Sequence, residues 1–313
     1  DVSGISFVSS QDTRMATELV ESMSMLSGYR VDSLLHFKDS LGRFDRLLRQ
    51  GIRYVAMLTR YYHSVFEYLD IIQFIRKVST EAKIIIGGGF LLSAVNKLES
   101  REKEALLELL QADIYICQDN CSSVLPRILK TGGAAFELAQ IPHIIWRQRD
   151  GNYRASEAIN KGEKQNLILP DWKLYPSFVK EITSLNTTIS CPFSCSFCAV
   201  KNKTDSFRVL SLETIRQNIQ YLMDIKRTRL LHFTDETINL PKERFQAFLE
   251  MLIELDSGMQ WYSFCRCEYM DDKTARLMKK SGCIAVLLGL ESGNDQQLNR
   301  MNKQVTVQKL RET

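Results

Sequence analysis

Between residues 1 and 130 the chain alternates short, β-branched apolar segments with longer segments of helical periodicity. The helical patterns include Ser64–Val78 and Ser100–Leu110. The segments that we predict to be strands are Ile5–Ser9, Val31–His36, Tyr54–Leu58, Lys83–Ile86 and Asp113–Cys117. Strands separated by helices predict an α/β fold, a doubly wound, Rossmann-type parallel sheet with helices on both faces. Ligands of such sheets bind at the carboxyl ends of the strands.

A second series of the same kind begins at Ile182. Its predicted strands are Ser184–Ile189, Arg229–Phe233, Trp261–Cys267 and Ile284–Leu290. Its predicted helices are Leu212–Lys226, Lys242–Leu255, Asp272–Ser281 and Asp295–Met301. A polar, proline-containing segment between the two series reads as a linker. We therefore predict a first domain over residues 1–150, a linker over 151–181 and a second domain over 182–313. Because the chain begins at Asp1 without a methionine, we expect it to be part of a longer protein.

Composition argues against several classes of protein. The net charge is only +4 and the basic residues are dispersed, which does not indicate a nucleic-acid partner. No apolar run reaches the roughly 18 residues of a membrane span, and no signal peptide is visible. Eight cysteines in 313 residues do not form a disulfide scaffold. We expect a protein of the reducing cytoplasm with no membrane partner.

Cys191, Cys195 and Cys198 lie in one short run with the spacing C-x3-C-x2-C, and Phe197 precedes the third cysteine. Thiolates this close in a loop can ligate three irons of a [4Fe-4S] cluster and leave the fourth iron open to a substrate or cofactor. Closed zinc sites use four ligands. The alternatives are a zinc site with a distant fourth ligand, and three cysteines that bind no metal.

With β-branched residues before it and an aromatic residue before its last cysteine, this motif resembles the signature of the radical S-adenosylmethionine (radical SAM) enzymes. The resemblance implies that the three cysteines hold a [4Fe-4S] cluster whose open iron chelates the amino and carboxylate groups of SAM. It also implies that one electron breaks a carbon–sulfur bond of SAM and yields a 5′-deoxyadenosyl radical. The four predicted βα units match the first four of the six units in that family's partial (β/α) barrel, so the barrel is expected to be incomplete at its C-terminus.

Two further segments resemble SAM-binding motifs of this family. Asp235 and Glu236 follow the second predicted strand, where related enzymes grip the SAM amino group, and a carboxylate suits an ammonium. A solvated capping turn is the alternative. The run from Leu288 to Gly293 matches Gly-x-Glu-Ser-Gly. The SAM contacts implied by these resemblances are Phe197, Asp235, Glu236, Arg266, Gly289, Glu291 and Ser292.

On the third predicted strand, alternation places Phe264, Arg266 and Glu268 on one face. In related enzymes an arginine at this place faces the barrel interior near SAM. The same alternation turns Cys265 and Cys267 toward the helices. A second metal site is one interpretation of these cysteines, and small buried apolar residues are the other, which also suits Cys283.

The first domain resembles the cobalamin-binding domain that precedes the barrel in one radical SAM subgroup. Gly87, Gly88 and Gly89 directly follow a predicted strand and match its glycine segment, and 141–151 resembles its closing hairpin. A backbone without side chains can approach a bulky ligand, although a plain strand-to-helix turn is the alternative. The histidine motif that ligates cobalt from below is absent from residues 9–15. We therefore expect cobalamin over the glycines with no histidine beneath cobalt.

The sequence favours a radical SAM enzyme, and specifically a cobalamin-dependent methyltransferase that acts on an unactivated centre. The expected partners are a small-molecule or peptide substrate and an external electron donor of the flavodoxin or ferredoxin type. One alternative is radical rearrangement, cyclisation or oxidation with a vestigial or non-methylating cobalamin domain. Another is a non-enzymatic zinc-binding module. The sequence does not identify the substrate.

Overall fold

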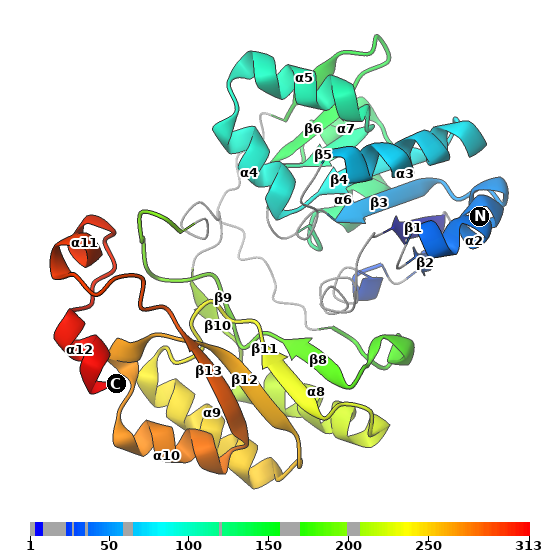
Figure 1. The fold of residues 1–313 in the computed structure, drawn as a ribbon. Coiled ribbons are helices and arrows are strands. Elements are labelled where there is room, and N and C mark those ends of the chain that lie inside the picture. Colours follow the sequence, from blue (N-terminus) through cyan, green and yellow to red (C-terminus); the bar gives the residue numbers. More distant parts are fainter. Residues whose placement is uncertain are drawn as a thin grey trace. The chain divides into compact units, whose positions relative to one another are not determined.

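The computed structural model describes residues 4–8, 23–26, 28–34, 37–58, 65–118, 121–156, 170–198 and 207–313. The chain divides into two compact units, Asp1–Pro170 and Asp171–Thr313 (Figure 1). The division falls within residues 151–181, the segment predicted to be a linker.

The first unit is built on a seven-stranded sheet in the order β2-β1-β3-β4-β5-β6-β7 (Figure 1). Strands β1 to β5 are parallel to one another, whereas β6 pairs in antiparallel fashion with both β5 and β7. Their bounds are β1 (Gly4–Val8), β2 (Arg30–Leu34), β3 (Tyr54–Leu58), β4 (Lys83–Gly87), β5 (Ile114–Ile116), β6 (Ile144–Arg147) and β7 (Tyr153–Ala155). The strand order reverses between β1 and β3, the kind of switch point at which ligands of open α/β sheets bind.

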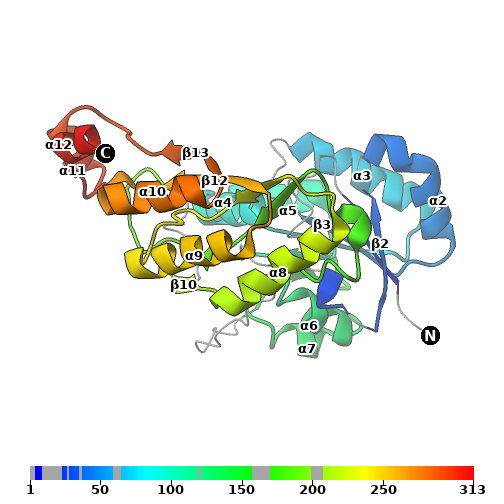
Figure 2. The same cartoon turned by 90° about the horizontal axis from the view of Figure 1, so that it is seen from below.

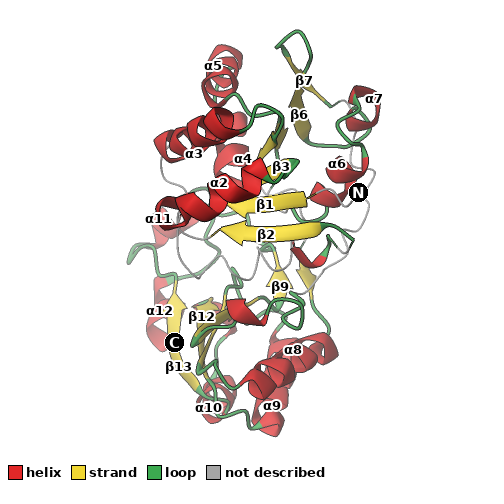
Figure 3. Ribbon diagram, turned by 90° about the vertical axis from the view of Figure 1, so that its right-hand side faces the viewer, coloured by secondary structure: helices red, strands yellow, loops and turns green. Residues whose placement is uncertain are grey.

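Helices cover both faces of this sheet, as the views in Figures 1 and 3 agree. One face carries α2 (Leu41–Arg49), α3 (Val65–Val78) and α5 (Ser100–Leu110), and the other carries α6 (Leu125–Lys130) and α7 (Ala135–Leu138). The unit also contains η2 (Phe37–Ser40) and α4 (Gly89–Lys97). Because both faces are covered, the central strands are apolar throughout rather than alternating.

The periodicity of α3 explains how it packs. Tyr68, Ile71, Ile72 and Ile75 recur at the spacing of one helical face, and all four are buried. They belong to a core cluster that also contains Val55 and other strand residues. Burial of this apolar area, at about 25 cal/mol per Å2, holds the helix layer on the sheet.

The second unit contains a four-stranded parallel sheet in the order β13-β12-β11-β8. Its strands are β8 (Ile182–Leu185), β11 (Leu230–Phe233), β12 (Gln260–Cys265) and β13 (Cys283–Leu288). The helices α8 (Leu212–Ile225), α9 (Lys242–Leu255) and α10 (Asp272–Lys280) lie along one face of this sheet (Figure 2). An edge-to-face contact of Phe233 with Phe248, at 5.1 Å between ring centres, joins the sheet to α9, and Phe233 makes a second such contact, at 5.7 Å, with Trp261 of the neighbouring strand β12.

The remaining elements of the second unit are short. Strands β9 (Thr188–Ile189) and β10 (Arg208–Val209) form an antiparallel ribbon separate from the main sheet. The others are η3 (Pro176–Phe178), η5 (Cys267–Tyr269), α11 (Asp295–Arg300) and α12 (Val307–Glu312). In the described parts of the chain, no helix combines the length and the apolar character that a membrane crossing requires.

Two of the differences between predicted and observed strand bounds bear on the site. The segment Ser184–Ile189 is not one strand, because β8 ends at Leu185 and β9 begins at Thr188. The backbone N–H groups of Thr187 and Thr188 turn to the carboxylate of Asp235 instead of a neighbouring strand. The third strand ends at Cys265, not Cys267, and η5 follows it.

Candidate functional site

The three cysteines of the C-x3-C-x2-C motif lie in a loop that directly follows β9. The thiol of Cys195 is buried, with 6% of the residue exposed, whereas Cys191 and Cys198 are partly exposed. The sulfur of Cys191 lies 3.8 Å from the hydroxyl of Thr237, just past β11. Residues 191–198, which we call the cysteine loop, therefore lie beside the acidic segment that ends this strand.

The segment after α11 holds the cysteine loop from the other side. The backbone N–H of Ser196 donates to the carbonyl of Met301 at 2.9 Å. The side-chain amide of Asn302 donates to the carbonyl and the hydroxyl of Ser194, at 3.2 and 2.9 Å. A segment more than a hundred residues away in sequence thus fixes the backbone between the first and third cysteines.

Arg266 extends from the end of β12 to the cysteine loop and is buried at 6% exposure. Its Nη1 donates to the sulfur of Cys195 at 3.7 Å, and its Nε donates to Glu268 at 2.6 Å. Its Nη2 donates to the backbone carbonyl of Lys303. The guanidinium carbon lies 3.7 Å from the ring centre of Phe193, which belongs to the loop. Burial alone would lower the pKa of Arg266, but Glu268 and then Cys195 raise it overall, so the guanidinium is charged.

The backbone of Arg266 is fixed by one buried side chain. The amide nitrogen of Asn239 donates to the carbonyl of Arg266 at 2.7 Å, and its oxygen accepts from the N–H of Arg266 at 3.0 Å. These bonds replace the ladder of a continuing strand, which accounts for the end of β12 at Cys265. The predicted alternation fails beyond this point, since Cys265, Arg266 and Cys267 are all buried. Glu268 reaches Arg266 from the turn η5 rather than from a strand face.

Glu291 pairs with a buried lysine. Lys303 Nζ lies 3.2 Å from Glu291 Oε1, and the two side chains are 8% and 33% exposed. Glu291 has a φ of 61°, which a non-glycine residue rarely adopts. A Cβ atom at Gly289 would lie 2.7 Å from that carboxylate and 2.8 Å from the amine. The missing side chain at Gly289, one of the implied SAM contacts, thus leaves room for this ion pair.

Asp235 faces the interior of its own unit. Its carboxylate is 2% exposed and accepts the backbone N–H of Thr187 at 2.9 Å and the hydroxyl of Thr188 at 2.6 Å. Burial raises its pKa to about 6, against the opposing effects of these hydrogen bonds and of the charge on Arg244. Its neighbour Glu236 is exposed. Of the two predicted SAM-binding carboxylates, only Glu236 lies at a surface where a ligand can reach it.

The other predicted contacts occupy different positions around the loop. Phe197 is 51% exposed, and its ring centre lies 5.9 Å from Lys303 Nζ. The hydroxyl of Ser292 accepts from the N–H of Asn294 at 3.1 Å in the turn before α11. The structure therefore gathers Phe197, Arg266, Gly289 and Glu291 at the cysteine loop, whereas Ser292 lies in the adjoining turn.

Sequence reasoning missed three residues that build this site: Asn239, Asn302 and Lys303. Each is polar and lies in a loop after a strand or helix, so composition alone does not distinguish it from a solvated turn residue. Lys303 is 6% exposed, and Asn239 is fully buried. The signal available for Lys303 was its position twelve residues after Glu291.

The remaining cysteines of the second unit are Cys265, Cys267 and Cys283. Cys265 and Cys267 are buried, and Cys267 packs against Leu298 and Val305. Burial raises the pKa of the Cys265 thiol to about 12 and that of Cys283 to about 11, so both thiols are protonated. Over the residues that the structure describes, no three histidine, cysteine, aspartate or glutamate side chains converge on a point where one metal ion could bind.

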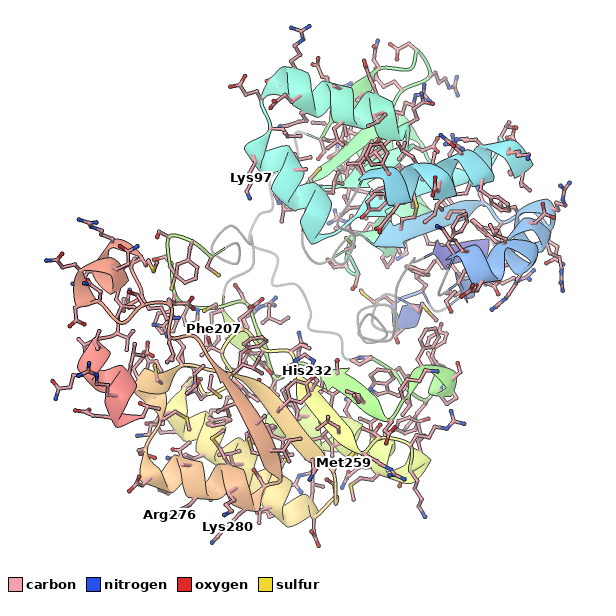
Figure 4. All side chains as sticks on the ribbon, in the orientation of Figure 1. Lys97, Phe207, His232, Met259, Arg276 and Lys280 are labelled. Atoms are coloured by element: carbon pink, nitrogen blue, oxygen red, sulfur yellow. The ribbon has the colours of Figure 1, made fainter. Side chains whose placement is uncertain are left out.

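The uncovered face of the second sheet carries aromatic side chains. His232, labelled in Figure 4, stacks on Tyr262 of the neighbouring strand with ring centres 4.3 Å apart and planes 4° from parallel. Phe264, two residues along from Tyr262, is 46% exposed. Alternation turns these side chains away from α9, toward the interior of the predicted barrel.

In the first unit, a contact inside the protein explains one of the predicted cobalamin glycines. A Cβ atom at Gly87 would lie 2.7 Å from the sulfur of Cys121 and 3.0 Å from Cβ of Ile116. Gly88 has a φ of 109°, which favours glycine for backbone reasons. The surroundings of Gly89 are not described, and residues 9–22, which include the position of the missing cobalt-ligating histidine, lie outside the described residues.

Comparison with known proteins places this geometry in context. Residues 185–313 match the Radical SAM superfamily. The anaerobic magnesium-protoporphyrin IX monomethyl ester cyclase of Rubrivivax gelatinosus is 28% identical over 174 residues, which cover 53% of this chain and 31% of the cyclase.

Two solved structures share the fold. The cobalamin-dependent S-adenosylmethionine radical enzyme OxsB matches with a TM-score of 0.73 and 16% identity, over 99% of this chain and 46% of that one. The radical S-adenosylmethionine methyltransferase TsrM from Kitasatospora setae matches with a TM-score of 0.74 and 15% identity, over 99% of this chain and 64% of that one. The predicted fold class is confirmed, and the chain spans less than two thirds of each of these proteins.

Proposed function

Because residues 185–313 belong to the radical SAM superfamily, we propose that this chain is part of an enzyme that cleaves SAM at a [4Fe-4S] cluster held by Cys191, Cys195 and Cys198. The observation that carries the proposal is the construction of the cysteine loop. Arg266 contacts Cys195, and Asn302 fixes Ser194. Both partners come from segments far from the loop in sequence, as a preformed metal site requires.

The donor set fits a cluster better than a single ion. Three thiols in one loop can ligate three different irons, and the fourth iron then lacks a protein ligand. A structural zinc ion needs four ligands that converge on one point, and no such group exists among the described side chains. The superfamily match over residues 185–313 favours the radical SAM interpretation over the zinc-binding module.

Held by Cys191, Cys195 and Cys198, the cluster would supply the single electron needed for reductive cleavage of a carbon–sulfur bond of SAM. The chain contributes position and charge. Glu291, held by Lys303, is oriented to accept hydrogen bonds from the ribose hydroxyls of SAM. Glu236, which is exposed, is the proposed partner of the SAM amino group. Phe197, Gly289 and Ser292 complete the proposed SAM site.

Methyl transfer from cobalamin is the reaction we propose for the whole protein. It is supported by the order of the first sheet, with its switch point between β1 and β3. It is also supported by the likeness over 99% of the chain to TsrM, a radical SAM methyltransferase solved with cobalamin. Cobalamin would lie at the carboxyl edge of the first sheet, near Gly88 and Gly89. Gly87 is accounted for by Cys121 and gives no separate support.

Radical cyclisation or oxidation is the second candidate. It is favoured by the similarity to the anaerobic cyclase, although that similarity covers 31% of the cyclase. In either reaction the substrate is a small molecule or a peptide, and a flavodoxin- or ferredoxin-type donor supplies electrons. The stacked His232 and Tyr262 rings would face such a substrate across the barrel interior.

An anaerobic reaction with SAM, cobalamin and a chemical reductant tests the proposal by mass spectrometry. SAM cleavage yields 5′-deoxyadenosine, and methyl transfer also yields S-adenosylhomocysteine and methylcobalamin. Deoxyadenosine without the methyl-transfer products would favour the second candidate. The variant with alanine at all three loop cysteines is expected to lose iron, sulfide and SAM cleavage together. A full complement of cluster iron in that variant would refute the assignment.

A further inference from the structure

We propose that Arg266 acts on the cluster ligand Cys195 and raises the reduction potential of the cluster, instead of binding SAM. The sequence resemblance implies that Arg266 contacts SAM, whereas its guanidinium contacts protein groups, including the sulfur of Cys195. The inference rests on the proposed function, since it requires that Cys195 ligates iron. It assigns Arg266 a positioning and electrostatic role that acts through a ligand of the cluster.

Protein groups already surround the guanidinium. An arginine has five N–H donors on three nitrogens, and each nitrogen of Arg266 contacts a protein acceptor. The acceptors are the carboxylate of Glu268, the sulfur of Cys195 and the carbonyl of Lys303. The ring of Phe193 lies against the guanidinium at 3.7 Å. With 7% of the side chain exposed, little of Arg266 remains for a ligand such as the SAM carboxylate.

The backbone beneath this side chain is equally constrained. Asn239 holds both the N–H and the carbonyl of Arg266, and Asn239 is itself fully buried. The Lys303 carbonyl belongs to the segment that also fixes the cysteine loop through Asn302. The nitrogen that contacts Cys195 is therefore held by several independent contacts. A side chain that had to swing toward SAM would break them.

The direction of the effect follows from charge. Reduction adds one electron to the cluster and its thiolate ligands, so a nearby positive charge and an N–H···S hydrogen bond stabilise the reduced form more than the oxidised form. Burial strengthens the interaction because less water screens it. Arg266 thereby makes the cluster easier to reduce by an external electron donor.

Redox titration of the reconstituted, SAM-free protein, followed by electron paramagnetic resonance, tests the inference. In Arg266→Gln the reduction equilibrium should shift about tenfold toward the oxidised cluster, a midpoint potential about 59 mV more negative for one electron. Arg266→Lys keeps the positive charge but lacks the planar guanidinium, and its midpoint potential should shift less. The matched control is Arg276→Gln, which removes the same charge from an exposed position on α10 (Figure 4) and should leave the potential unchanged.

The outcomes separate the two roles. If Arg266→Gln keeps the wild-type potential but loses SAM affinity, Arg266 is a SAM-binding residue and the inference is wrong. An equal shift in Arg276→Gln would also overturn it, because the effect would then be one of net charge. If Arg266→Gln takes up no cluster, Arg266→Lys decides, since loss of SAM affinity at an unchanged potential in that variant refutes the proposal. A wild-type protein that binds no cluster would instead refute the proposed function itself.

Discussion

Lys303 Nζ and Glu291 Oε1 lie 3.2 Å apart, and Gly289 makes room for both. Gly289 and Glu291 thus both contribute to one ion pair, although the sequence motif suggests that each contacts the cofactor separately. The buried amine holds the carboxylate on a backbone of positive φ, a conformation that costs on the order of 1–3 kcal/mol. The ion pair therefore orients Glu291 before any ligand arrives.

Substitution of Gly289 by alanine should disturb this pair and weaken SAM binding. The new Cβ atom would lie under 3 Å from both charged groups, so one of them must move. Gly293→Ala is the matched control, since a Cβ atom there meets nothing within 4 Å. Anaerobic calorimetry should show weaker SAM binding for Gly289→Ala and wild-type binding for Gly293→Ala. Equal affinities for the two variants would contradict this account.

Replacement of Glu291 by glutamine should lower SAM affinity roughly ten- to a hundredfold, the equivalent of one charged hydrogen bond. Glutamine is preferred to alanine, because alanine would leave the amine of Lys303 buried without a partner and would lower stability. Lys303→Met should weaken binding in the same direction by releasing Glu291. If Glu291→Gln binds SAM normally but melts many degrees lower, Glu291 is a structural residue.

Gly87→Ala should destabilise the first unit whether or not cobalamin is present. The added methyl group would meet the sulfur of Cys121 at 2.7 Å, and overpacking of this kind typically costs about 1–3 kcal/mol. The double variant with Cys121→Ala should recover part of the loss. Gly42→Ala, with open space around its position in α2, should be neutral or slightly stabilising. Thermal unfolding with and without cobalamin measures all four proteins, and a loss confined to the cobalamin-bound state would point to a ligand contact.

The buried carboxyl of Asp235 should make stability depend on pH. Its pKa rises from 3.8 to about 6 on folding, so the folded protein binds this proton more tightly than the unfolded chain. The free energy of unfolding should therefore fall as the pH rises from 4 to 6, by about 3 kcal/mol at most. Asp235→Asn should lack this component. The melting-temperature difference between the two proteins, followed across that range, measures it. If the melting temperature of the wild-type protein instead rises with pH relative to that of Asp235→Asn, the hydrogen bonds from Thr187 and Thr188 outweigh burial.

Local periodicity predicted most of the fold. The bounds of Tyr54–Leu58 and Lys242–Leu255 match the observed β3 and α9, because each segment carries its own apolar pattern. The cysteine loop was equally visible, since its three thiols are close in sequence. These features depend on residues that are near one another along the chain.

The features that the sequence did not predict depend on contacts between residues far apart along the chain. The break between β8 and β9 depends on Asp235, which lies 48 residues after Thr187. The contacts of Arg266 with Asn239 and Lys303 join segments 27 and 37 residues away. Periodicity along one strand cannot reveal whether an arginine at its end meets a cofactor or a carbonyl from elsewhere in the fold.

The bonds from Asn302 to Ser194, between residues 108 positions apart, also bear on how the site is assembled in the cell. Synthesis proceeds from the N-terminus, and the cysteines leave the ribosome long before the residue that fixes their loop. At a rate of about 5–20 residues per second, the interval lasts on the order of ten seconds. During that time the cysteine loop lacks its hydrogen bonds with Asn302, and its thiols are exposed to oxidants. We therefore expect iron and sulfide to be delivered after translation has passed this residue, and oxygen exposure during synthesis to do the most harm.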